Sequence, residues 1–358
     1  MRVLVTGGAG YIGSHTCLEL LTKAHEVFVV DNLSNGNIKA IERVQNISNR
    51  ELEFSKTDIR DGERLDRIFA EFKPEAVIHF AGLKAVGESV NEPLRYYNVN
   101  VCGTVSLLEA MDRADCLNIV FSSSATVYGT PEYLPYDEKH PTSPANPYGR
   151  TKLIIEEIIH DWVSADKKRR GTSLRYFNPI GAHPSGQIGE DPHGVPNNLM
   201  PFISQVASGK QEYLQIFGSD YETRDGTGER DYIHVMDLVD AHIKALHNQS
   251  RLKPFEVLNI GNGKGITVLE LINNFQLASG ASIKYEFLPR RDGDLPAFWA
   301  NPTRAFEKLS WKPQLTIDHM CRDTWRWQRN NIKGYDAENY KCDKISDLES
   351  KDKGHAKN

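Results

Sequence analysis

Features that would mark a secreted, membrane-spanning or metal-dependent protein are scarce in this sequence. Its 358 residues include five cysteines, scattered without a CxxC pair or a metal-like spacing, so we interpret them as reduced thiols. They are Cys17, Cys102, Cys116, Cys321 and Cys342. No apolar run approaches the roughly 20 residues that cross a bilayer, and no basic and apolar leader precedes the first predicted strand. We therefore expect a cytoplasmic protein with no membrane partner.

A large excess of one charge is also missing. Lys and Arg total 43 against 48 Asp and Glu, which gives a formal net charge of −5. This balance argues against a nucleic-acid partner and against an anionic membrane surface. The charge balance is still compatible with a small anionic substrate, because a few local arginines suffice to bind such a molecule.

What the sequence does contain is a regular alternation of short apolar runs and helical patterns. Alternation of this kind is typical of a parallel sheet with helices on both faces. The predicted strands cover residues 3–5, 27–30, 52–54, 77–80, 119–121 and 173–176, and the predicted helices include 12–23, Gly62–Phe72, 101–113 and 148–164. We predict an α/β fold, with a Rossmann-type doubly wound parallel sheet and a smaller C-terminal α/β substrate-binding domain.

After about residue 177 the pattern loosens into loops rich in Gly and Pro. We therefore place a Rossmann domain at residues 1–177, with some later segments returning to it, and the substrate-binding domain at 178–335. Residues 336–358 are dominated by charged and amide side chains and have little apolar content. Such a composition predicts a disordered tail.

A glycine-rich turn follows the first predicted strand and opens a helix. Gly7, Gly10 and Gly13 satisfy the dinucleotide-binding fingerprint, and Tyr11 and Ile12 begin the helix. Missing side chains allow a tight turn and close approach to a pyrophosphate, and the helix N-terminus favours the phosphate charge. Asp31 ends the next strand, where a carboxylate can accept from ribose hydroxyls and would repel the 2′-phosphate of NADP. The pattern predicts NAD as the cofactor.

Other polar and small residues follow the next predicted strands. Because the carboxyl ends of parallel strands meet at one edge of the sheet, we expect them to line the same cofactor site. These candidate residues are Asn32, Asn35, Asp58, Ile59, Phe80, Ala81, Gly82 and Lys84.

A second group of residues has the chemistry of alcohol oxidation. Tyr148 and Lys152 are four residues apart at the start of a predicted helix, and Ser124 follows the fifth predicted strand. Residues i and i+4 share a helical face, so the Lys152 ammonium can stabilise the Tyr148 phenolate and lower a pKa that is about 10 in water. A tyrosine tuned in this way can act as a general base.

These residues and several longer segments resemble the extended short-chain dehydrogenases/reductases, and within them the enzymes that epimerise UDP-hexoses at C4. The resemblance covers about residues 1–330, and the later segments are more specific than the glycine turn. They are 80–90, 121–129, 175–186, 194–201, 226–238 and 289–300.

The resemblance implies an isomerase of galactose metabolism that interconverts UDP-glucose and UDP-galactose. Tyr148 would accept the proton of the sugar 4-hydroxyl, directly or through Ser124, as a hydride leaves C4 for NAD. Lys152 would hold the cofactor ribose, and Phe177 would lie near the nicotinamide. The 4-keto sugar would rotate in the pocket and receive the hydride on its other face, so NAD would stay tightly bound.

The resemblance also implies the residues that bind the nucleotide sugar. Arg230 and Arg291 would pair with the diphosphate, although salt bridges to the adjacent Asp231 and Asp292 are an alternative. Asp294 would bind a uridine ribose hydroxyl, and Phe298 would fill the space beside C2 of the sugar and disfavour N-acetylated substrates. The remaining substrate residues are Ser124, Tyr148, Asn178, Asn198, Leu199, Gln215 and Phe217.

The chain departs from the family at one cofactor position. Val99 stands where many relatives have asparagine, so Asn98 or Asn100 is the alternative source of an amide contact. His183 and His193 lie in one loop with Glu190 and Asp191, but their irregular spacing argues against a metal, and we predict none.

Two other functions fit the same scaffold. A sugar-nucleotide 4,6-dehydratase would carry Asp-Glu after Ser124, whereas this chain has Ala125 and Thr126. A non-catalytic NAD-binding regulator would not need Ser124, Tyr148 and Lys152 together. The resemblance further implies a homodimer through helices near 101–113 and 148–164.

Overall fold

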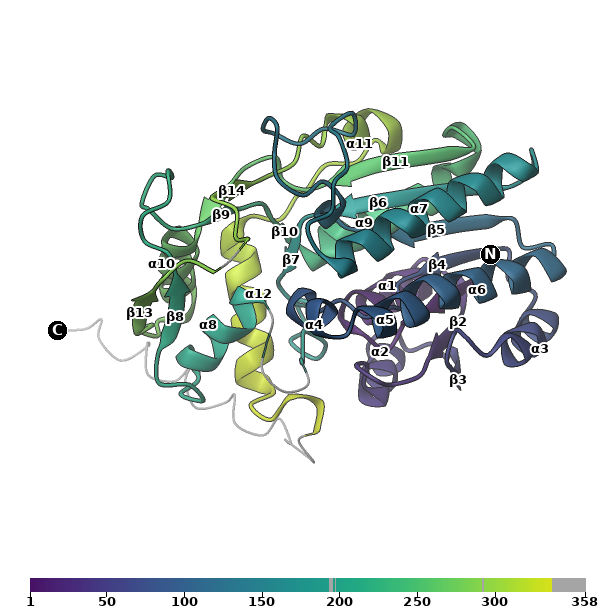
Figure 1. Ribbon diagram of the computed structural model, residues 1–358. Helices are drawn as coiled ribbons and strands as arrows, with labels where there is room; N and C mark the ends of the chain where they lie inside the picture. The colour runs from purple at the N-terminus through teal and green to yellow at the C-terminus, as the bar shows by residue number, and fades with distance from the viewer. Residues whose placement is uncertain (193–195, 197, 292, 337–358) are drawn as a thin grey trace.

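The computed structural model describes residues 1–192, 196, 198–291 and 293–336. A parallel sheet of seven strands forms the larger part of the molecule, in the spatial order β11-β6-β5-β4-β1-β2-β3 (Figure 1). In that order the strands are Phe255–Ile260, Arg170–Tyr176, Asn118–Ser122, Ala76–His79, Arg2–Thr6, Glu26–Asp31 and Glu53–Lys56. This is the strand order of a doubly wound dinucleotide-binding sheet, which confirms the predicted fold class.

Helices cover both faces of the sheet because its central strands are apolar on both sides. In β1, Val3 and Val5 belong to one core cluster and Leu4 to the other, and all three side chains are fully buried. Complete burial of each such side chain contributes about 1.5–3 kcal/mol. One cluster includes residues of α1 (Tyr11–Thr22), α2 (Ile38–Ser48) and α9 (Val235–Asn248), and the other includes residues of α3 (Gly62–Phe72), α6 (Gly103–Arg113) and α7 (Pro147–Ala165).

A smaller part lies beyond the carboxyl ends of the sheet strands, on the left in Figure 1. Its core is formed mainly by α8 (Leu199–Ala207), α10 (Val268–Ser279) and α12 (Ile317–Asn330). Three short sheets accompany these helices. They pair β7 (Asn178–Ile180) with β10 (Tyr232–His234), β8 (Leu214–Phe217) with β13 (Tyr285–Leu288), and β9 (Glu229–Arg230) with both β12 (Ile266–Thr267) and β14 (Ala297–Phe298).

The six predicted strands are all present, and the sheet contains a seventh strand that was not predicted from the sequence. β11 comes from residues 255–260 and completes the sheet beside β6. The helix predicted from residue 101 also differs, since a π-helical turn, Tyr97–Cys102, precedes α6. Two short helices, α4 (Val86–Asn91) and α5 (Pro93–Tyr96), come before that turn, and α11 (Thr303–Leu309) follows β14.

No helix in the part of the chain that the structure describes is both long and apolar enough to span a membrane. The four cysteines among these residues are free thiols. Cys342 and all but the first residue of the predicted 336–358 tail lie outside the described residues.

Candidate active site

The glycine turn after β1 has the geometry that a dinucleotide requires. Gly7 adopts a positive φ of 72°, and a Cβ on Gly13 would lie 2.2 Å from the Gly7 carbonyl oxygen, so neither position tolerates a side chain. Gly10 caps α1 without a side chain, and the first turn of α1 carries no acidic residue. The first-turn N–H groups are therefore oriented to bind an anion such as a pyrophosphate.

Asp31 is fixed at the end of β2, beside the glycine turn. Its two carboxylate oxygens accept hydrogen bonds from the backbone N–H groups of Ala9, at 3.0 Å, and Leu33, at 2.8 Å. Burial raises the pKa of Asp31, and these two N–H groups oppose the shift. A carboxylate held in this way keeps lone pairs for ribose hydroxyls, so the residues present fit NAD.

The next strand end joins Asp58 to the same region. Asn32 donates to Asp58 at 3.0 Å, and the Arg60 guanidinium bonds both oxygens of the Asp58 carboxylate. These bonds hold the pKa of Asp58 well below its usual range. The structure thus brings together Asp31, Asn32 and Asp58 as the sequence predicted, and Arg60 is an additional member.

Ser124, Tyr148 and Lys152 are all buried at the carboxyl edge of the sheet. Asn146 caps α7 by accepting from the Gly149 N–H at 2.9 Å, which places Tyr148 in the first turn of the helix. Ser124 follows β5 and accepts hydrogen bonds from both the N–H and the hydroxyl of Thr126. The Lys152 ammonium donates to the Ser122 carbonyl at 2.9 Å and lies 5.8 Å from the centre of the Tyr148 ring.

The electrostatics of this group differ from the sequence-based expectation. Burial raises the pKa of Tyr148 far above its usual value of about 10, and the group that lowers it is Ser124, through a hydrogen bond. Lys152 is not among the groups that shift the Tyr148 pKa. Burial lowers the pKa of Lys152 itself to about 8, while the negative charge of Glu156 opposes that shift.

An ion pair one helical turn beyond Lys152 was not predicted from the sequence. Glu156 is one turn after Lys152 on α7, where it forms a buried two-point ion pair with Arg175 of β6 and accepts from Ser123. Its position continues the i, i+4 series of Tyr148 and Lys152, and that spacing is the signal that could have revealed it. The pair fixes α7 against β5 and β6 and so fixes the depth of Lys152.

On the substrate side, two of the predicted diphosphate and ribose ligands contact each other. Arg230 donates to the Asp294 carboxylate at 2.6 Å, and the Arg291 guanidinium lies 3.7 Å from the centre of the Phe217 ring. Asp231 is not a partner of Arg230, because its carboxylate accepts from the backbone N–H groups of Asn262, Gly263 and Ala300. Asp292 lies outside the described residues.

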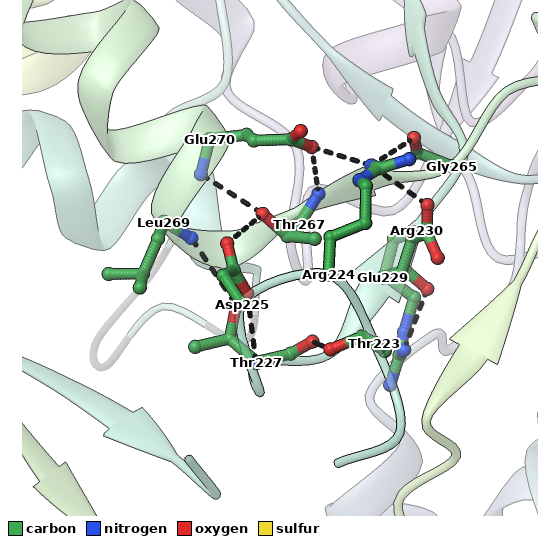
Figure 2. Close-up of polar contacts among 10 residues, drawn as sticks. All are labelled: Thr223, Arg224, Asp225, Thr227, Glu229, Arg230, Gly265, Thr267, Leu269 and Glu270. Carbon is green, nitrogen blue, oxygen red and sulfur yellow. Dashed lines mark hydrogen bonds and ion pairs between the residues drawn. The ribbon is translucent and has the colours of Figure 1, made fainter. Parts of the chain in front are cut away.

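The strand that carries Arg230 is anchored by a polar network centred on Arg224 (Figure 2). The Arg224 guanidinium contacts the carboxylates of Glu229 at 2.9 Å and Glu270 at 2.7 Å, and it also donates to the Gly265 carbonyl. Asp225 accepts from Thr227 and from the Thr267 hydroxyl that caps α10. The network therefore joins the loop before β9 to the N-terminus of α10.

Phe298 lies in an aromatic cluster that includes the predicted nicotinamide neighbour. Its ring centre is 5.0 Å from that of Phe177 and 4.8 Å from that of Tyr136. In β14, Phe298 pairs with Arg230 of β9. One short sheet thus holds both a predicted diphosphate ligand and the predicted sugar-pocket wall.

The other predicted substrate residues lie on separate elements of the chain. Asn178 begins β7, and its N–H donates to the Asp231 carbonyl. Asn198 precedes α8 and donates to Glu190, while Leu199 is the first residue of that helix. Gln215 of β8 bonds Glu286 at an exposed edge, so its side chain is already engaged within the protein.

Both alternatives to the missing amide at Val99 have hydrogen-bond partners within the protein. The Asn100 side chain is buried, where it accepts from the Leu83 N–H and donates to the Leu83 carbonyl and the Thr151 hydroxyl. Asn98 accepts from Arg60. His183, in the loop where a metal was considered, bonds Ser185, and His193 lies outside the described residues.

A doubly wound sheet with a glycine turn after β1, and a buried serine, tyrosine and lysine at its carboxyl edge, defines the class of NAD-dependent short-chain dehydrogenases/reductases of the extended type. A family model described as GDP-mannose 4,6 dehydratase matches residues 4–324. The chain is 52% identical to a UDP-glucose 4-epimerase of Bacillus subtilis over 94% of this chain and 99% of that protein.

Solved structures agree with this assignment. A UDP-glucose 4-epimerase from Stenotrophomonas maltophila, with bound NAD and formylated UDP-arabinopyranose, gives a TM-score of 0.90 at 47% identity, covering 92% of this chain and 98% of that one. The Bifidobacterium longum enzyme, in complex with NAD+ and UDP, gives 0.89 at 46% identity, covering 93% and 100%. The chain belongs to the UDP-glucose 4-epimerase family.

Proposed function

We propose that this protein interconverts UDP-glucose and UDP-galactose by reversible epimerisation at C4, with NAD bound tightly between turnovers. The observation that carries the proposal is the buried group of Ser124, Tyr148 and Lys152 at the edge where the glycine turn and Asp31 also lie. Relatives that match nearly the whole chain support the same activity. The reaction would serve galactose metabolism in the cytoplasm.

Each residue of the group has a distinct task in the proposed reaction. Bound NAD supplies the hydride acceptor. Tyr148 takes the proton from the sugar 4-hydroxyl as the hydride leaves C4, and it returns a proton to the same oxygen when the hydride comes back to the other face of the rotated 4-keto sugar. Ser124, which hydrogen-bonds Tyr148, orients the phenol and can relay the proton. Lys152 holds the cofactor ribose from its place 5.8 Å from the centre of the Tyr148 ring.

Residues of the smaller part would hold the UDP moiety while the sugar turns. Arg230 and Arg291 suit the diphosphate because guanidinium groups form paired hydrogen bonds with phosphate oxygens. On substrate binding, Arg230 would share its contact with Asp294 between the carboxylate and the phosphate. The nucleotide site would be completed by Asn178, Asn198, Leu199 and β8, the strand that carries Gln215 and Phe217.

We also propose a homodimer, formed through α6 and α7 and the short helices beside them. Val86 and Val90 of α4, Leu94 of α5 and Val105 of α6 are exposed apolar side chains, and Leu94 is 81% exposed. Exposed apolar side chains gathered on adjacent helices are typical of a protein interface. Light scattering after size-exclusion chromatography should give twice the chain mass, and a monomer that stays active would contradict this assembly.

A coupled assay tests the proposed activity directly. Purified protein is incubated with UDP-galactose, and UDP-glucose dehydrogenase with added NAD reports the UDP-glucose that forms. We expect steady formation of UDP-glucose without a 4-keto-6-deoxy sugar. A deoxy product would indicate a dehydratase instead, and binding of NAD without turnover of the sugar would indicate a regulator.

A further inference from the structure

One carboxylate joins the cofactor side of the site to the substrate side. Glu190 lies in the loop between β7 and α8, and its Oε1 atom accepts from Asn198 Nδ2 at 2.9 Å and from Lys84 Nζ at 3.2 Å. Lys84 belongs to the segment after β4 that is predicted to bind NAD. Asn198 is predicted to bind the nucleotide sugar. The proposed reaction assigns no task to Glu190.

The loop holds this carboxylate at a defined place. The Glu190 carbonyl accepts from the Trp327 indole of α12 at 3.1 Å, and the Gly189 N–H donates to the Tyr335 hydroxyl at 3.2 Å. A Cβ on Gly189 would lie 2.4 Å from the Trp327 ring, so the backbone packs directly on the indole. The backbone position of Glu190 is therefore set by α12 and Tyr335.

Burial makes the two polar partners important to Glu190. Its side chain is 11% exposed, whereas that of Lys84 is 46% exposed. A nearly buried carboxylate needs hydrogen-bond donors or an opposite charge, and Asn198 and Lys84 supply one of each. Burial is the main cause that raises the pKa of Tyr11, the first residue of α1, and the charge of Glu190 adds to this shift.

We propose that Glu190 is a positioning residue that couples the two halves of the site. It orients Lys84 for the cofactor and Asn198 for the nucleotide sugar, so that occupation of either half favours binding at the other. Such coupling is reciprocal, because each ligand changes the affinity of the other by the same factor. The inference rests on the proposed function for the roles of Lys84 and Asn198.

The test compares two substitutions of Glu190 in the holoenzyme. Glu190→Gln keeps an acceptor for Asn198 but loses the charge that pairs with Lys84, and Glu190→Ala loses both. We expect Glu190→Ala to raise the KM for UDP-galactose about tenfold while kcat changes less than about threefold, as for the loss of a hydrogen bond to a charged group. Glu190→Gln should fall between Glu190→Ala and the unmodified enzyme.

A second readout does not depend on turnover. Saturating UDP should slow the loss of bound NAD during dialysis of the unmodified protein, and it should slow this loss much less in Glu190→Ala.

A double-mutant cycle tests the contact between Glu190 and Lys84. The KM of the double variant, Glu190→Ala with Lys84→Ala, should rise by less than the product of the two single effects. Fully multiplicative effects, or equal protection by UDP in both proteins, would overturn the coupling.

Tyr335→Phe is the matched control for a purely structural role. It removes a hydroxyl that fixes the same loop but leaves the Glu190 carboxylate in place. We expect it to lower the melting temperature without the change in KM, and an equal rise in KM would show that only the loop matters. An inactive unmodified protein would refute the proposed function, whereas an active one that tolerates Glu190→Ala would refute only the coupling.

Discussion

At the scale of single residues, the phenol of Tyr148 is the group on which the proposed chemistry depends. Tyr148→Phe removes one hydroxyl from a buried ring and leaves Ser124, Lys152 and the glycine turn unchanged. Activity with UDP-galactose should fall on the order of 10²–10⁴-fold, the usual contribution of a general base. Bound NAD, measured after acid release, should match the unmodified protein, and near-normal turnover would exclude Tyr148 as the base.

Phe298 gives a prediction about which sugars are accepted. Its ring packs on Tyr136 and Phe177, and in this close-packed cluster an added acetamido group would have to displace it. We expect poor turnover of UDP-N-acetylglucosamine by the unmodified enzyme and clear turnover by Phe298→Cys. Phe287→Cys, at an exposed site on β13, is the control and should change neither activity. Efficient N-acetyl turnover without any substitution would refute this role.

The pKa values and long-range contacts of single residues could not be predicted from the sequence. The glycine turn, Asp31 and the Tyr148–Lys152 spacing could be recognised because their neighbours along the chain define their geometry. The pKa of Tyr148 could not be predicted, because it is raised by burial among residues distant in sequence and is not shifted by the ammonium four residues away. The ion pair between Glu156 and Arg175 depends likewise on the contact of α7 with β6.

At the scale of elements, the short strand β9 connects a remote arginine to the substrate site. Arg224→Ala would leave the buried Glu229 carboxylate without its ion-pair partner and would loosen the loop before β9. Because Arg230 follows Glu229, we expect the KM for UDP-galactose to rise about three- to tenfold with kcat nearly unchanged. Arg322→Ala removes an exposed ion pair on α12 and serves as the control. Equal KM values for the two variants would contradict a positioning role for Arg224.

The helices and strands differ in how well the sequence predicts them. β1, β2, β4 and β5 each contain a short apolar run followed by turn residues, so period and composition suffice to predict them. The π-helical turn at 97–102 depends on a tertiary contact, because the Asn100 amide inside it bonds Leu83 and Thr151. The two-residue strands β9, β12 and β14 are too short for any periodicity to reveal.

At the scale of the whole molecule, buried histidines make stability depend on pH. Burial lowers the pKa of His15 and His79 to about 3 and that of His242 to about 4, whereas all three bind protons near 6.5 when the chain is unfolded. Between these values the unfolded state binds more protons than the native state. The free energy of unfolding therefore falls as the pH drops below about 6.5, by up to about 1.4 kcal/mol per pH unit for each histidine.

Urea titrations at pH 7 and pH 5 measure this effect. His242→Phe keeps a ring of similar size beside Phe80 and Tyr176, and it removes Nε2, which has no hydrogen-bond partner, together with the contact of Nδ1 to the Leu238 carbonyl. The variant should lose less stability between the two pH values than the unmodified protein. His160→Gln, at an exposed position, should leave the difference unchanged. Identical losses in all three proteins would show that His242 stays neutral in both states or charged in both.

The late position of β11 in the chain has a consequence for synthesis on the ribosome. β6 is complete at residue 176, but its outer neighbour is supplied by residues 255–260. Until those residues have left the exit tunnel, β6 presents a row of unpaired backbone groups, and such an edge invites pairing with another nascent chain. The glycine turn and the cofactor edge emerge long before that point. Early capture of NAD by the growing chain would thus favour the correct arrangement of the sheet while its last strand is still being made.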